Sequence, residues 1–302
     1  MKILLGVISV VVVIVLVAVV VQELRYLGIR RNLAGDRQSL FHSGSVFHVV
    51  SLLKLAPAQE LLSGVRHFVD TVEKDGAEVV YAGKAVINGR TSSQLPPDDW
   101  DAFVLTQYPS RAAWDAASAS VDHQNLDSRL ASVYSLGMKR SAGINLALPA
   151  LLLGQRVSQL VRGEPPRYPF KPVSRLSEAP PEARERMNTF ADLLGANLEY
   201  GREALVIFNF AKEGTSKQRK ANAGYGGEMF GLFAETGAGP LHMGKAVTLE
   251  GDADFDQVII VFYPGVEFFG EMIVSEFYQG IFPGKQLGDD LSSLTVPILP
   301  HL

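Results

Sequence analysis

The chain has 302 residues, of which 47% are hydrophobic and 20% are charged, and its formal net charge at pH 7 is −4. This length gives room for two domains, and the composition is that of a globular protein. The absence of cysteine excludes disulfides, thiolate metal sites and cysteine nucleophiles. The slightly acidic balance, without a dense basic cluster, predicts no nucleic-acid partner.

The first segment of the chain is continuously apolar, because residues 3–21 hold nothing more polar than Ser9. A helix of this length spans about 28 Å at roughly 1.5 Å per residue, close to the hydrocarbon thickness of a bilayer. The run exceeds the ~7–15 apolar residues of a secretory signal, and no small-x-small cleavage site follows Ala18. We therefore expect residues 1–22 to be a single-pass transmembrane anchor that contacts the bilayer through residues 3–21. A cleaved signal is the alternative.

The connector after the anchor, residues 23–45, predicts the orientation of the chain. It carries four arginines, Arg25, Arg30, Arg31 and Arg37. Only Lys2 and the terminal amine precede the anchor, so the positive-inside bias favours a cytoplasmic body. Only two residues precede the anchor, so the comparison of charge on its two sides is weak. A periplasmic or other extracytoplasmic body therefore stays open.

The remainder predicts one order of elements twice, strand–helix–strand–strand–helix–strand, which is the split βαβ or ferredoxin-like unit. The first domain, residues 46–148, has strands expected at 46–55, 77–87, 100–108 and 141–148, with helices at 61–75 and from 110 through 128–135. The second domain, residues 204–302, has strands expected at 204–211, 241–249, 255–263 and 294–299, with helices at 217–235 and 266–278. The predicted fold class is thus α+β, preceded by one transmembrane helix.

Short matches at steady offsets connect the two domains. The stretch from Trp100 to Pro109 matches that from Phe255 to Pro264 at an offset of 155, and both end in Tyr-Pro. We interpret the ordered matches as an internal duplication. Residues 258–263 are apolar at every position, so both faces of that strand should be covered. We therefore expect the two units to pack face to face as an intrachain α/β barrel, which removes the need for a homodimer without excluding one.

The linker between the domains, residues 149–203, contains three distinct stretches. Residues 149–162 predict an amphipathic helix with a basic face, lying either on a membrane or on the barrel; we favour the barrel because apolar stripes usually mark core faces. Residues 163–181 are rich in proline and predict an extended segment. Residues 181–198 predict a further helix.

The residues that carry a family resemblance are the first-strand end Asn209-Phe-Ala-Lys212, the repeated Gly-Lys-Ala-Val of the second strand and the Tyr-Pro exit from the third. With these motifs the chain resembles the dimeric α/β-barrel superfamily. It is most similar to the family named domain of unknown function 1330, in tandem over residues 46–148 and 204–299. The superfamily includes EthD-like and antibiotic-biosynthesis-monooxygenase-like proteins, small isomerases and haem-dependent dismutases. The resemblance thus implies architecture more than chemistry.

Candidate ligand-pocket residues are expected to line a pocket between the sheet and the helices in either domain. In the first domain they are Ser51, Lys54, Tyr81, Lys84, Tyr108 and His123; in the second they are Asn209, Lys212, His242, Lys245, Tyr263 and Tyr278. Tyrosine and histidine can move protons, and a lysine can hold an anion. The competing interpretation is that these side chains have a packing role, with Tyr108 and Tyr263 fixing the chain where it turns at a strand end. His48 and His242 are expected to face the sheet interior as packing residues.

No spacing typical of a metal site or nucleotide loop is present, so we expect no metal and no cofactor; a haem protein is a weaker third idea. Two functional hypotheses remain. The first is a membrane-anchored, non-catalytic module that binds a small apolar molecule or a partner. The second is a cofactor-free monooxygenase or isomerase that works in one barrel pocket.

Overall fold

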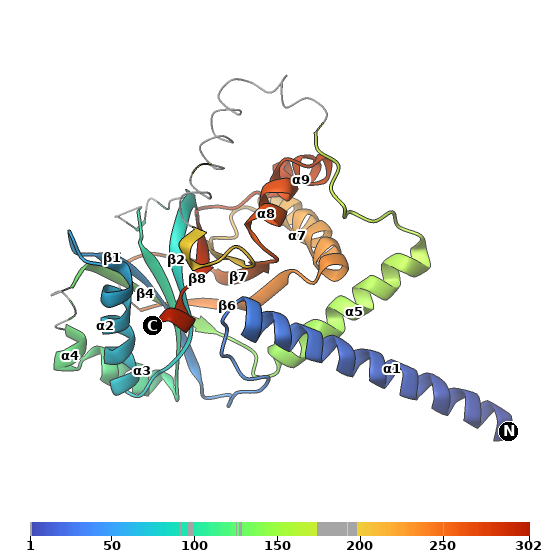
Figure 1. Cartoon of the computed structure of the whole chain (residues 1–302), viewed down its shortest axis with the longest axis horizontal. Helices are drawn as coiled ribbons and strands as arrows, with labels where there is room; N and C mark the ends of the chain where they lie inside the picture. Colours follow the sequence, from blue (N-terminus) through green and yellow to red (C-terminus); the bar gives the residue numbers. More distant parts are fainter. Residues whose placement is uncertain are drawn as a thin grey trace.

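The computed structural model describes residues 2–302 except residues 91, 93, 96–98, 125, 127–128, 174–191, 193–197 and 250. A strand barrel carries helices on its outside, and one long helix projects away from it (Figure 1). The strands are β1 (Phe47–Leu55), β2 (Glu78–Arg90), β3 (Ala102–Tyr108), β4 (Leu130–Lys139), β5 (Leu205–Ala211), β6 (Gly239–Thr248), β7 (Gln257–Tyr263) and β8 (Asp290–Pro297).

The α-helices are α1 (Lys2–Gly28), α2 (Leu61–Lys74), α3 (Arg111–Ser118), α4 (Val121–Gln124), α5 (Ile144–Arg162), α7 (Ser216–Thr236), α8 (Val266–Ile273) and α9 (Glu276–Ile281). A π-helical segment, η1 (Ile29–Leu33), continues α1, and short 3-10 turns are η4 (Leu198–Tyr200), η5 (Phe282–Gly284) and η6 (Leu299–His301). Helix α1 with η1 is long and apolar enough to cross a membrane, with a mean hydropathy of 2.4 in its span Ser9–Leu33.

The eight strands form a closed antiparallel barrel in the order β1-β3-β2-β8-β5-β7-β6-β4. The predicted α+β barrel is therefore confirmed. Strands from the first part of the chain are adjacent as β4-β1-β3-β2, and those from the second part as β8-β5-β7-β6. The two sets meet at the β2–β8 and β4–β6 pairs, so closure leaves no free sheet edge.

The two aspartates of the repeated stretch make the same backbone contacts in both sets of strands. The N–H of Asp101 donates to the carbonyl of Leu53 at 2.9 Å, and its carboxylate accepts from the N–H of Leu55 at 2.8 Å. The N–H of Asp256 donates to Ala211 at 2.9 Å, and its carboxylate accepts from Glu213 at 2.8 Å. The repeated aspartate therefore secures the end of the neighbouring strand.

The barrel interior is filled with large side chains. Phe208 lies at its centre, with its ring centroid 5.0 Å from that of Phe103 and 5.6 Å from that of Tyr81. Phe210 and Phe255 form a further aromatic pair at 5.8 Å, and aliphatic side chains from β1, β4 and β7 complete the same buried cluster. Offset and tilted ring pairs at these distances are favourable and exclude water. The interior is thus a hydrophobic core.

Helices cover the outer face of the barrel in separate groups. Helix α2 packs over β1, β2 and β3 through its apolar face, and α3 covers the start of β1 and the end of β3 through Trp114. Helices α7 and α8 cover β5, β7 and β8, and residues from the end of α1 and the first half of α5 join that cluster. The amphipathic periodicity of α2 explains this placement, since its apolar residues form one stripe.

Two predicted elements of the first domain were wrong. Residues 128–135 were expected to be helical and 141–148 to be the last strand, but the strand is Leu130–Lys139 and residue 144 begins α5. Leu130, Val133 and Tyr134 have helical spacing, so the local pattern is ambiguous. Pairing of this segment between β1 and β6 closes the barrel, and that tertiary constraint overrides the local preference.

Other predicted elements needed smaller corrections. The single helix expected at 266–278 is two, because buried Ser275 interrupts it: its hydroxyl donates to the carbonyl of Met272 and accepts from the N–H of Tyr278. The strand expected at 294–299 is β8, which begins at Asp290. The helix expected at 149–162 is confirmed within α5. The helix expected at 181–198 falls almost wholly outside the described residues.

Gly244 provides a test of barrel closure. A Cβ at this position would collide with the carbonyl of Lys139 and approach Met138 Cγ to 2.6 Å, across the β4–β6 pair. We expect Gly244→Ala to lower the free energy of unfolding by about 1–3 kcal/mol through overpacking. Gly226 in α7 has nothing within 4 Å, so Gly226→Ala should instead stabilise by up to about 1 kcal/mol. Equal effects in denaturant titrations of the two variants would contradict this explanation.

Candidate functional site

The predicted pocket residues do not gather at one place. Three of the four lysines are ion-paired: Lys54 with Asp99 at 2.7 Å, Lys84 with Glu199, and Lys212 with Asp254. Lys245 is exposed on β6. Of the uncharged candidates, the hydroxyl of Ser51 bonds that of Ser135, and the side chain of Asn209 accepts from Ser292.

The predicted tyrosines and histidines lie mostly in packed surroundings. Tyr108 and His123 make edge contacts with Trp114, beneath and beside α3. Tyr263 packs against Phe269, and Tyr278 against Phe282, on the outer layer of the second set of strands. Tyr81 is inside the barrel, where its hydroxyl bonds Thr295 at 2.8 Å.

The protonation states of these groups do not suit proton transfer at neutral pH. Burial raises the pKa of Tyr81, Tyr108 and Tyr263, and burial lowers the pKa of His123. Each tyrosine therefore stays protonated, and the histidine stays neutral. A general base is most effective when its pKa is near the working pH, and these shifts move the pKa values away from neutrality.

A buried polar cluster closes one mouth of the barrel, and we call it the mouth cluster. Its members are Arg30, Asp36, Gln38, His48, Arg140, Asn145 and His242. The connector after α1 supplies Asp36 and Gln38, and its backbone bonds the barrel where the N–H of Arg37 donates to the carbonyl of Val80 at 2.9 Å. The expectation that His48 and His242 are buried in the sheet is confirmed, with exposed fractions of 0% and 1%.

Asp36 is the centre of the mouth cluster. Both its carboxylate oxygens lie 3.3 Å from Arg30 Nη2, one of them accepts from the N–H of Gln38 at 2.8 Å, and the other bonds His242 Nε2. Burial alone would raise the pKa of Asp36, but Arg30, His242 and the backbone donor outweigh it and hold the pKa well below its ordinary value. The carboxylate is therefore charged inside the protein.

A second set of bonds connects the connector, β1, β4 and α5. Gln38 Oε1 accepts from His48 Nε2 at 2.8 Å and from Arg140 Nη1 at 2.9 Å. Asn145 Oδ1 accepts from both Arg30 Nη1 at 2.7 Å and Arg140 Nη2 at 2.6 Å. Burial lowers the pKa of His48 to about 2 and that of His242 to about 3, so both rings are neutral.

The mouth cluster joins η1, the connector, β6 and α5 through buried polar contacts. Burial lowers the pKa of Arg140 to about 9, and the nearby positive charge of Arg30 adds to this effect. Within the mouth cluster four buried nitrogens have no partner among the described residues: Arg30 Nε, Arg140 Nε, His48 Nδ1 and His242 Nδ1. Within the described part of the chain no group of three histidine, aspartate or glutamate side chains could hold a metal ion.

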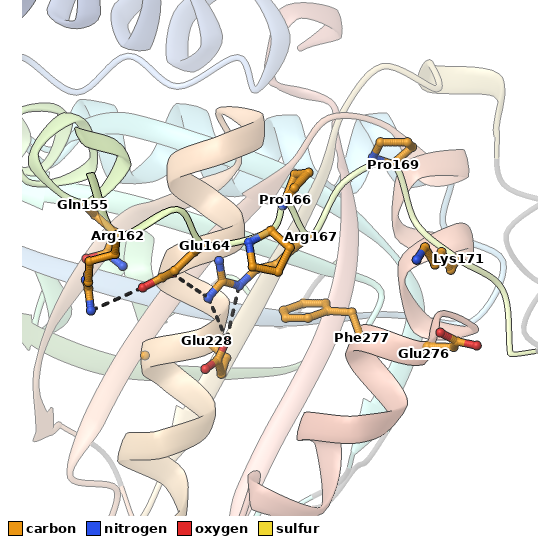
Figure 2. Close-up of a pocket in the computed structure, with 12 residues that line it drawn as sticks. Gln155, Arg162, Glu164, Pro166, Arg167, Pro169, Lys171, Glu228, Glu276 and Phe277 are labelled. Atoms are coloured by element: carbon orange, nitrogen blue, oxygen red, sulfur yellow. Dashed lines mark hydrogen bonds and ion pairs between the residues drawn. The ribbon is translucent and has the colours of Figure 1, made fainter. Parts of the chain in front are cut away.

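The described cleft lies outside the barrel, between α5, the strap (residues 163–173), α7 and α9, with a volume of about 570 Å³. Figure 2 shows Phe277 in its middle, facing Arg167, with Arg162 and Glu164 toward one end and Lys171 and Glu276 toward the other. The cleft is open and combines an aromatic floor, three prolines and charges of both signs.

Arg167 fixes the strap to α7. Its Nη1 lies 3.0 Å from Glu235 and its Nη2 lies 2.8 Å from Glu228, while its N–H also donates to Glu235 at 2.7 Å. Gly231 lies between those glutamates, and a Cβ there would approach Arg167 Cζ to 2.7 Å. The arginine is therefore committed to positioning the strap, which leaves Phe277, Lys171 and Glu276 to meet a ligand.

Sequence reasoning missed the mouth cluster and the cleft. Arg30 and Asp36 were assigned to a polar connector, and nothing in the local pattern marks them as buried. The sequence did hold an indication of the contact with the strap. Glu228 and Glu235 are seven residues apart, so both lie on one face of α7, where they can pair with a basic side chain.

The barrel and helices define the fold class, a closed antiparallel barrel with one projecting apolar helix. No protein-family model matches the chain, and no curated protein matches it. Among solved structures the chain is similar to an anthrone oxidase-like protein, at 8% identity and a TM-score of 0.42 over 85% of this chain and 92% of that one. It is also similar to a mutant chlorite dismutase from Candidatus Nitrospira defluvii, at 13% identity and a TM-score of 0.41 over 87% and 96%. Values this low assign no activity.

The buried ion pair of the mouth cluster predicts a large effect of neutralising Asp36. Asp36→Asn leaves the Arg30 charge buried without its counter-ion, so we expect a loss of roughly 3–5 kcal/mol in unfolding free energy. Asp122→Asn, which removes a surface pair with Lys74, should leave the denaturation midpoint unchanged. Similar midpoints for both variants would show that the buried pair does not hold the fold.

The two buried histidines predict a pH dependence. In the unfolded chain each takes up a proton below about pH 6.5, whereas in the folded chain His48 and His242 do so only near pH 2 and 3. The unfolded state therefore binds more protons, and stability falls as pH drops from 6.5, by at most about 1.4 kcal/mol per pH unit for each ring. Denaturation between pH 4.5 and 7.5 should show a shallower dependence of stability on pH in His242→Gln but not in the non-titrating control Gly226→Ala. An unchanged slope in His242→Gln would disprove the assignment.

Proposed function

We propose that the protein is a membrane-anchored, non-catalytic binding module. In this proposal α1 holds the chain in the bilayer, the barrel is a packed scaffold, and the cleft beside the strap takes a small ligand. The observation that carries it is the filled barrel interior, in which Phe208 is surrounded by Phe103 and Tyr81.

The filled interior weighs against the alternative, a cofactor-free monooxygenase or isomerase in a barrel pocket. Such chemistry needs a substrate-sized space with a proton-transferring side chain at its wall. The interior candidates Tyr81 and His242 are instead bonded to Thr295 and Asp36, and the connector closes the mouth above them. The alternative would require the mouth cluster to open.

The cleft supports a ligand that has an aromatic ring and one charged group. The ring would lie on Phe277, which is half-buried and already faces the Arg167 guanidinium, 6.0 Å from its centroid. The charged group would meet Lys171 if anionic or Glu276 if cationic, since neither side chain is ion-paired with another described residue. An open cleft of this size fits a small molecule with part of its surface in water.

The proposal also covers the internal duplication of the chain and the side of the membrane on which the body lies. We propose that residues 46–148 and 204–302 are tandem ferredoxin-like units related by duplication, each resembling the family named domain of unknown function 1330. The repeated strand order and the matching contacts of Asp101 and Asp256 support it. The body is proposed to be cytoplasmic because arginines follow α1, and a homodimer remains compatible with this arrangement.

A single preparation of the full chain in lipid nanodiscs tests the binding function. Phenylacetate and phenethylamine are the probes, observed by ligand-detected saturation-transfer NMR. We expect transfer to at least one probe, lost in Phe277→Ala and kept in Phe282→Ala, which removes an exposed ring outside the cleft lining. Oxygen consumption with phenolic substrates should not exceed that of empty nanodiscs. Absent or Phe277-independent binding, or turnover that Tyr81→Phe abolishes, would refute the proposal.

A further inference from the structure

The outward face of α5 is apolar along its whole length. Four of its side chains are strongly exposed, with exposed fractions of 56% for Leu151, 52% for Val157, 65% for Leu160 and 81% for Val161. Leu146, Ala147, Ala150 and Gly154 continue the same side of the helix. A helix on the surface of a soluble protein normally places polar residues outward, so this face requires a partner.

The opposite face of α5 is fixed to the protein. Leu148 and Leu152 are buried in the cluster beneath α7, and Gln159 Nε2 donates to the carbonyl of Gly231 in α7 at 3.0 Å. At its start, Asn145 is bonded within the mouth cluster. Since α5 is held at both ends, it cannot rotate to bury Val157 and Val161, and they stay outward.

Helix α1 lies beside the first part of α5, and both leave the barrel on the same side (Figure 1). The exposed surface of α1 is also apolar, with valines such as Val13 and Val17 each more than half exposed. Phe41, exposed at 62%, lies near Gly143 just before α5. The apolar surface of the anchor thus continues onto α5.

The junction between α1 and the body sets their relative position. The hydroxyl of Tyr26 bonds the carbonyl of Pro240, and Arg30 connects η1 to Asn145 of α5 at 2.7 Å. The connector that follows η1 is also bonded to the barrel, where the N–H of Arg37 donates to the carbonyl of Val80 at 2.9 Å. If a bilayer holds α1, the orientation of α5 relative to that bilayer is therefore fixed.

We propose that the outward face of α5 lies in the membrane interface next to α1, so that the protein contacts the bilayer through two helices. The inference rests on the proposed anchoring by α1. Polar residues at the edge of this face, Gln155, Ser158 and Arg162, suit the headgroup region, as in helices that lie in the plane of a membrane. The lipid bilayer is the partner favoured over a second copy because the apolar surface of the anchor continues onto it.

The absence of cysteine makes a direct test clean, since any introduced cysteine is the only label site. Single variants Val157→Cys and Val161→Cys of the full chain carry a nitroxide in liposomes. Val13→Cys reports on α1, and Val121→Cys, exposed at 71% on α4, reports on the far side of the barrel. Power saturation compares the accessibility of each label to oxygen, which enters lipid, and to a water-soluble nickel chelate.

We expect labels at 157 and 161 to be accessible to oxygen and protected from nickel, as at 13, and the label at 121 to show the reverse. Nickel accessibility at 157 and 161 with a lipid-exposed label at 13 would overturn the α5 inference and leave the anchor intact. A water-exposed label at 13 would overturn the anchor itself. Protection of 157 and 161 from both reagents, with dipolar broadening between labels, would overturn the inference in favour of a second copy of the chain.

Discussion

The charge pair between Arg30 and Asp36 is the interaction on which the rest of the structure depends. It is fully buried, and a carboxylate removed from water is tolerated only where several donors replace its hydration. Those donors come from η1, from the connector and from β6, so one group joins the end of the apolar helix to the barrel wall. Asn145 extends the same network to α5 through Arg30. The end of α1 and the start of α5 are thus joined in one buried network.

The inside of the barrel is a packed hydrophobic core. Aromatic and aliphatic side chains together fill this core, and ion pairs of Lys54 with Asp99 and of Lys212 with Asp254 lie at the strand ends. Loops and helices on the outside of such a core can vary without disturbing it. The strap and α5 both belong to that outer layer, and both connect the first set of strands to the second.

Much of the fold could be predicted from the sequence because strands and helices here have clear periods. The apolar run of β7 indicated a covered strand, and the repeated Tyr-Pro exits indicated the repeated order of elements. The last strand of the first set was missed, since Leu130, Val133 and Tyr134 suit a helix as well as a strand, and only pairing with distant β6 decides. The site was harder: Lys54 and Lys212 were read as ligand groups, but aspartates nearby in space neutralise them. Arg30 and Asp36 gave no local signal, because their burial depends on residues more than a hundred positions away.

The sequence distance within the mouth cluster sets an order of events during synthesis. His242 follows Asp36 by 206 residues, so the ribosome makes α1 and the connector long before β6 exists. Asp36 and Arg30 therefore stay without their β6 partner until the second set of strands has been translated. Contacts of such long range form late and slow the completion of folding. The barrel therefore closes last, around the segment that was made first.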